Sequence, residues 1–113
     1  MYYELSKPQK KIARKVMDKG LFKDYRDSLE AAQKVIGDWN LGKYTDREAY
    51  MELYKQVTTH DKIIARRYND KGGSRWVEVM ADQLGNDVIS LEDIAEFDEE
   101  VRDVIVRYSE FFR

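Results

Sequence analysis

His60 and Asp61 are adjacent residues whose types could carry out chemistry. An imidazole beside a carboxylate can act as a general base or bind a metal ion. The pair lies in a segment of helical apolar spacing, and Asp61 falls inside its apolar stripe. Because the chain has one histidine and no cysteine, it offers a poor ligand set for a metal. We therefore predict that Asp61 is a buried polar residue with a structural partner, and we assign no catalytic residue, metal or cofactor.

Pairs of acidic residues one helical turn apart are a second candidate for chemistry. Glu48 and Glu52 have this spacing, as do Glu92 and Glu96, and such carboxylates can bind Mg²⁺. Acidic residues are also common in the first turns of helices, because they interact favourably with the helix dipole. A carboxylate- and Mg²⁺-dependent hydrolase is therefore the least favoured of three functional hypotheses.

Cations cluster in two regions and support a second hypothesis, nucleic-acid binding. The expected first helix is basic, and the region from Lys62 to Arg75 places further cations around two glycines. Glycines before a helix can present backbone N–H groups to a phosphate. The candidate contacts are Lys10, Lys11, Arg14, Lys62, Arg66, Arg67, Lys71 and Arg75. An isoelectric point near 5.5 argues against this function.

The charges are unevenly distributed along the chain, although the formal net charge is only −2. Residues 1–23 carry seven lysines and arginines against two acids, whereas residues 82–103 carry nine acids against one arginine. Such a division can neutralise two elements of one chain, orient two copies, or attract a charged partner. We expect the first helix to pair with the acidic segment of the same chain.

Two long apolar stripes predict the elements that position these residues. The first runs through Phe22, Tyr25, Leu29, Ala32, Ile36 and Trp39, and the second through Tyr50, Leu53, Tyr54, Val57, Ile64 and Tyr68. Steps of three and four residues place each set on one face of a helix. We expect these faces to form the core, together with both tryptophans, Trp39 and Trp76.

Capping patterns and glycines predict where the helices begin and end. A capping box at Ser6 and Gln9 starts the first helix, and Gly20 is expected to end it. Further helices are expected at about 23–40, 45–69 and 74–85. A last helical segment runs from residue 90 to the C-terminus, with a break near Phe97 and Asp98.

Size and composition then predict the fold class. The chain has 113 residues, of which 42% are hydrophobic and 37% charged, with one proline. These values suit one domain with a packed core and a solvated helical surface. We predict an all-α fold, a compact bundle of four to five helices with short connections, as a single domain over residues 1–113.

The favoured function is a small, non-enzymatic helical module that mediates protein–protein interaction or self-association, for example as a dimer. Tyrosines are common at interfaces, and several apolar residues lie outside the predicted core faces: Tyr2, Tyr3, Val35, Tyr44, Val106 and Phe111. No apolar run approaches the roughly 20 residues of a membrane span, and no signal peptide is evident. We therefore expect a cytoplasmic protein without membrane association.

Overall fold

The computed structural model describes residues 2–113, and within that range it contains helices and no strands. The four α-helices are α1 (Lys7–Asn40), α2 (Asp46–Tyr68), α3 (Trp76–Gly85) and α4 (Glu99–Ser109). Three short 3₁₀ helices are η1 (Gly73–Arg75), η2 (Leu91–Ile94) and η3 (Glu110–Phe112). The prediction of an all-α fold is therefore confirmed.

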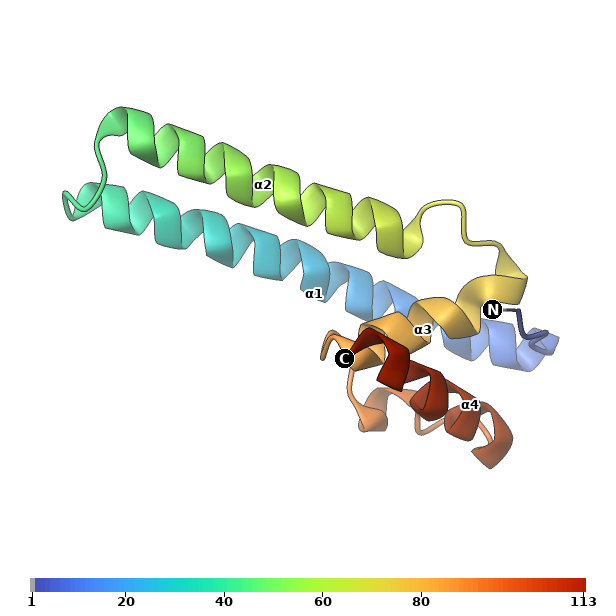
Figure 1. The fold of residues 1–113 in the computed structure, drawn as a ribbon. Coiled ribbons are helices and arrows are strands. Elements are labelled where there is room, and N and C mark those ends of the chain that lie inside the picture. Colours follow the sequence, from blue (N-terminus) through green and yellow to red (C-terminus); the bar gives the residue numbers. More distant parts are fainter. Residues whose placement is uncertain (1) are drawn as a thin grey trace.

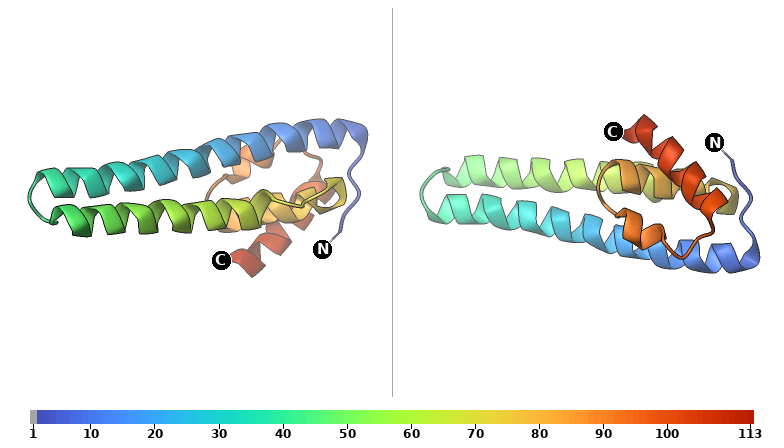
Figure 2. Two further views of the ribbon diagram at one scale, coloured as in Figure 1. Left: turned by 90° about the horizontal axis from the view of Figure 1, so that it is seen from above. Right: turned by 90° about the horizontal axis from the view of Figure 1, so that it is seen from below.

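Helices α1 and α2 form a long antiparallel hairpin, and α3 and α4 pack beside one end of it (Figure 1, Figure 2). The molecule measures 53 × 26 × 23 Å and has a radius of gyration of 17.0 Å. A compact chain of this length has a radius of gyration of about 13 Å. The helical bundle is therefore somewhat extended and not fully compact, because the hairpin projects beyond the packed core.

Helix α1 continues through Gly20, where the sequence predicted a helix end. The expected capping box is present at its start, where the Ser6 hydroxyl accepts a hydrogen bond from the backbone N–H of Gln9 at 3.3 Å. Gly20 is buried in the middle of the helix, and a Cβ atom here would lie 2.1 Å from Nε2 of Gln83. The glycine therefore allows α3 to approach α1 closely and does not end the helix.

The other helix boundaries follow the local sequence. The Thr45 hydroxyl accepts a hydrogen bond from the N–H of Glu48 at 3.2 Å, which completes the predicted capping box of α2. The predicted break near Phe97 is confirmed, because the Asp98 carboxylate accepts from the N–H of Val101 at 3.3 Å and starts α4.

The hydrophobic core lies at one end of the hairpin, which we call the base. It is built from the N-terminal half of α1 together with α3, η2 and α4, and its buried residues are Leu5, Ala13, Val16, Val77, Met80, Leu84, Ile89, Ile94, Phe97, Val101, Val104 and Ile105. Trp76, which we expected in the core, is half-buried at its edge. The core therefore covers the first turns of α1 and leaves the rest of the hairpin outside it.

A buried polar cluster joins α1, α2 and α3 at the base. Arg67 donates hydrogen bonds through Nη1 to Asp24 at 2.7 Å and through Nε to Asp82 at 3.1 Å. The Arg67 side chain is only 4% exposed. Burial disfavours its charge, but the two carboxylates outweigh this effect and raise the pKa of Arg67. The guanidinium thus stays charged and links both acids.

Tyr68 and Gln83 extend the same cluster. The Tyr68 hydroxyl donates to Asp24 at 2.5 Å and accepts from Nε2 of Gln83 at 2.9 Å. The same nitrogen of Gln83 donates to the carbonyl oxygen of Met17 at 3.0 Å. Burial and the hydrogen bond to Asp24 raise the pKa of Tyr68, so its hydroxyl is neutral at neutral pH. These bonds fix the C-terminal end of α2 against α1 and α3.

Alanine substitution of two glycines in α1 should have opposite effects on stability. In Gly20→Ala the new Cβ collides with the fully buried Gln83, and we expect a loss of about 1–3 kcal/mol, as for other overpacked cores. A Cβ at Gly37 meets no atom within 4 Å. Gly37→Ala should therefore stabilise the helix by about 0.5–1 kcal/mol. Urea unfolding measures both free energies, and a stabilised Gly20→Ala variant would contradict the close approach of α3.

Removing the buried cation should destabilise the fold strongly. Arg67→Met leaves the carboxylates of Asp24 and Asp82 without their shared partner, and we expect a loss of about 3–5 kcal/mol. Arg66 is exposed on the same helix, so Arg66→Met is the matched control and should change stability by less than about 0.5 kcal/mol. Equal unfolding free energies of the two variants in urea would show that the cluster does not hold the base together.

Candidate interaction surface

Beyond the core, the hairpin forms a two-helix projection that we call the arm and define as residues 22–64. Within these residues, all of which the structure describes, the buried apolar side chains are Val35 and Ala49. Other residues of the two helices are half-buried and small or polar, such as Ser28, Ala31 and Gln56. The arm therefore has only a thin apolar core of its own.

Ten large apolar side chains are exposed along the arm, and we call eight of them, all except Leu41 and Met51, the apolar flank. Its members are Phe22, Tyr25, Leu29, Ile36 and Trp39 of α1, and Tyr50, Tyr54 and Val57 of α2. Their exposed fractions run from 42% for Trp39 to 71% for Tyr50. The prediction that these stripes and Trp39 form the core is therefore wrong, since the helices pack through a different face.

The flank residues of the two helices lie on the same side of the arm. Val35 of α1 and Ala49 of α2 mark the faces through which the two helices pack. Counted at 100° per residue around each helix axis, the flank residues lie about a quarter turn from these faces, in the same rotational direction on both helices. Because the helices are antiparallel, this places both sets on one side of the arm. Near the tip the two stripes meet in an open groove of about 200 Å³, lined by Val35, Ile36, Trp39, Asp46, Ala49, Tyr50 and Leu53. Nε1 of Trp39 donates to Asp46 at 2.8 Å, which fixes the indole beside this groove.

Asp61 lies on α2 at the edge of the apolar flank, and its side chain is exposed. The prediction of a buried Asp61 is wrong, because no element among residues 2–113 covers the stripe to which it belongs. Val35, which we placed outside the core faces, is instead buried between the helices. The buried acids are Asp24 and Asp82, which no spacing pattern had singled out.

Two of the eight residues predicted to contact a nucleic acid form ion pairs with carboxylates of the same chain. Arg67 is buried in the polar cluster, so its assignment as a contact is wrong. Arg75 lies 2.8 Å from the carboxylate of Glu78, and hydrogen bonding in this pair raises the pKa of Arg75. The predicted basic surface is therefore smaller than the sequence suggested.

The structure brings together part of the remaining basic set. The guanidinium of Arg14 lies 5.2 Å from the ring centre of Trp76. Nζ of Lys10 lies 3.5 Å from the position that a Cβ at Gly73 would take. The first helix and the segment that begins α3 are thus neighbours, as the hypothesis requires. Lys11, Lys62 and Arg66 are exposed and Lys71 is half-buried. Contact of these six cations with a nucleic acid stays a prediction.

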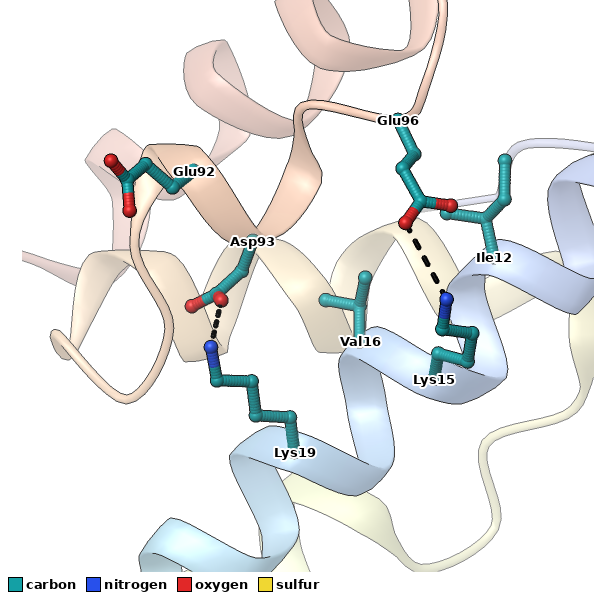
Figure 3. Close-up of a pocket in the computed structure, with 7 residues that line it drawn as sticks. All are labelled: Ile12, Lys15, Val16, Lys19, Glu92, Asp93 and Glu96. Carbon is teal, nitrogen blue, oxygen red and sulfur yellow. Dashed lines mark hydrogen bonds and ion pairs between the residues drawn. The ribbon is translucent and has the colours of Figure 1, made fainter.

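The expected pairing between the first helix and the acidic segment is confirmed. Figure 3 shows a small pocket between α1 and the η2 region that two ion pairs cross. Lys15 lies 3.4 Å from Glu96, and Lys19 pairs with Asp93. These lysines are therefore neutralised within the chain.

Comparisons with known proteins add no family to this description. No family model, curated protein or solved structure matches the chain. Among the described helices, none combines the length and hydrophobicity needed to cross a membrane. Within residues 2–113, no group of three or more His, Asp or Glu side chains is placed to hold a metal ion.

Acid should weaken the fold through the Lys19–Asp93 pair. Burial raises the pKa of Asp93, but Lys19 and Ser90 together lower it by more, so it lies below the ordinary value of 3.8. A carboxyl group with a lowered folded-state pKa stabilises the protein above its unfolded pKa, and this stabilisation is lost as pH falls through the folded value. We therefore expect the unfolding free energy to decline as pH falls below about 4.

Variants of the pair test this assignment. Asp93→Asn should make the acid dependence shallower, and Lys19→Met should do so to a smaller extent, because the hydrogen bonds from Ser90 remain. The double variant should behave like Asp93→Asn. Urea unfolding at a series of pH values measures the slope. An Asp93→Asn variant with the wild-type slope would contradict the role of this pair.

Proposed function

We propose that the protein is a non-enzymatic helical module that binds a protein surface through the apolar flank of its arm. The observation that carries this proposal is the exposure of eight large apolar side chains on one side of two helices. Single exposed apolar residues are normal on soluble proteins, whereas a contiguous patch of more than a few hundred Å² marks an interaction site. The partner is another protein or a second copy of this chain.

The size of the flank supports this function. A complete aromatic side chain offers roughly 200 Å², so the exposed fractions of the flank correspond to on the order of 800 Å² in total. The largest apolar patch on a typical monomer is about 300–600 Å². The flank is therefore larger than scattered surface residues would produce.

The composition of the flank supports the same function. Five of its eight residues are aromatic, and aromatic residues are enriched at the centres of protein interfaces. The thin core of the arm adds a structural reason. Helices in proteins gain most of their stability from packing of their apolar faces. The apolar faces of the arm are exposed, so a partner that covers them would supply this packing.

Nucleic-acid binding has less support from the geometry. Two of the cations predicted to contact a nucleic acid are already engaged within the chain. Arg67 is buried against Asp24, and Arg75 is paired with Glu78. Lys15 and Lys19 of the basic first helix pair with acids as well. Nonspecific phosphate binding depends on several free cations on one surface, so the flank is the stronger candidate.

Site-specific photo-cross-linking in living cells tests the proposal. A benzoylphenylalanine at Tyr54 lies on the flank, whereas the same group at Lys55, also exposed, points away from it. We expect covalent protein adducts from position 54 and few from position 55 after irradiation. Equal yields from both positions, or no adduct from either, would contradict binding through the flank.

A further inference from the structure

We infer that the apolar flank binds a second copy of this chain, so that two arms form a four-helix bundle. This inference rests on the proposed function, because it names the partner of the same surface. Three observations carry it, namely the repeat of the apolar residues, the area of the flank, and the position of two opposite charges. Each of them fits an identical arm better than an unrelated surface.

The apolar residues of both helices follow the repeat of a helical bundle. On α1 positions 22, 25, 29, 32, 36 and 39 alternate steps of three and four. On α2 positions 50, 54, 57, 64 and 68 follow the same repeat, with Asp61 at its one polar position. A repeat of 3.5 residues is the pattern of helices that pack side by side along their length. Two antiparallel helices with both seams on one side are half of a four-helix bundle. A second copy supplies the other half.

The area of the flank is what such an assembly needs. Each partner in a specific protein interface buries about 800 Å². The exposed area of the flank is of the same order, so two copies facing each other would cover it without a further surface. The core at the base packs on α1 through Ala13, Val16 and Gly20 and leaves the flank open.

Arg26 and Asp61 suggest how the two copies are oriented. The Trp39–Asp46 and Asp24–Arg67 hydrogen bonds fix which residues of α1 and α2 lie at the same level. Counting along the arm between these two bonds, Arg26 of α1 lies opposite about residues 61–64 of α2. Both side chains are exposed, and neither has an ion-pair partner among the described residues.

A two-fold axis that runs along the arms brings these charges together. Each α1 then lies against the α2 of the other copy, and Arg26 of one copy meets Asp61 of the other twice. All neighbouring helices are antiparallel in this arrangement, which is favourable for their dipoles. With the tips at opposite ends, each α1 would face the other α1, and this pairing of charges would be lost.

The position of Asp61 gains a role in this assembly. It occupies one position of an otherwise apolar seam on α2. A single polar residue in a seam lowers affinity but fixes register and the number of helices. Asp61 would therefore select the register in which it meets Arg26.

The oligomeric state of the purified protein tests the inference. Light scattering and sedimentation should show a dimer of twice 13.4 kDa. Leu29→Asp places a charge in the middle of the flank at a 70% exposed position, so the monomer should still fold, as circular dichroism can check. We expect the dimer to weaken by roughly a hundredfold. Met51→Asp, at an exposed apolar residue off the flank, is the matched control and should dimerise like the wild type.

Charge exchange tests the orientation of the two copies. Arg26→Asp and Asp61→Arg should each weaken the dimer by about tenfold, because like charges then meet twice. The double variant restores the pairs and should recover most of the wild-type affinity. Failure of this recovery would overturn the orientation with the axis along the arms.

The remaining outcomes separate this inference from the proposed function. A dimer that Leu29→Asp does not weaken would overturn the inference, because another surface would then hold it together. A monomer whose position-54 cross-links lead to a different protein would overturn the second copy as partner and leave the proposed function in place. A monomer without cross-links from position 54 would overturn both.

Discussion

The guanidinium of Arg67 is the point on which the arrangement of the helices depends. It crosses from the end of α2 to carboxylates on α1 and α3, and its side chain is 4% exposed. Such a buried group is costly to desolvate, so its bonds contribute more to defining one geometry than to net stability. Because α2 otherwise has little contact with α3, this cluster fixes the end of α2 against α1 and α3, whereas the continuous α1 sets the direction of the arm.

The apolar flank lies on the arm, beyond the hydrophobic core at the base, so the core does not cover it. Within the arm, Val35 and Ala49 are the apolar residues buried between α1 and α2, and the larger apolar residues lie to one side of them. Leu29 and Tyr50 are then among the most exposed apolar residues of the chain. Burying them in the same molecule would require the hairpin to fold back on its base, which a continuous 34-residue α1 prevents.

Features decided by neighbouring residues could be predicted from the sequence, whereas features decided by the fold could not. The capping boxes at Ser6 and Thr45 depend on residues three positions apart, and both are present. Gly20 has two uses, a helix end or a close approach, and only the position of Gln83 distinguishes them. Apolar spacing likewise identified the flank as a surface that needs cover. It could not show whether that cover comes from the same chain, and the error at Asp61 has the same origin.

The distribution of charge bears on what kind of association the flank can form. Lys15 and Lys19 of the basic first helix are paired with acids of the same chain. These pairs lie at the base, while the middle of the flank consists of uncharged side chains. Binding driven by burial of apolar area is little weakened by salt, whereas phosphate binding falls steeply as salt rises. A partner that binds the flank would thus stay bound at high ionic strength. Salt would screen only the attraction between Arg26 of one copy and Asp61 of the other.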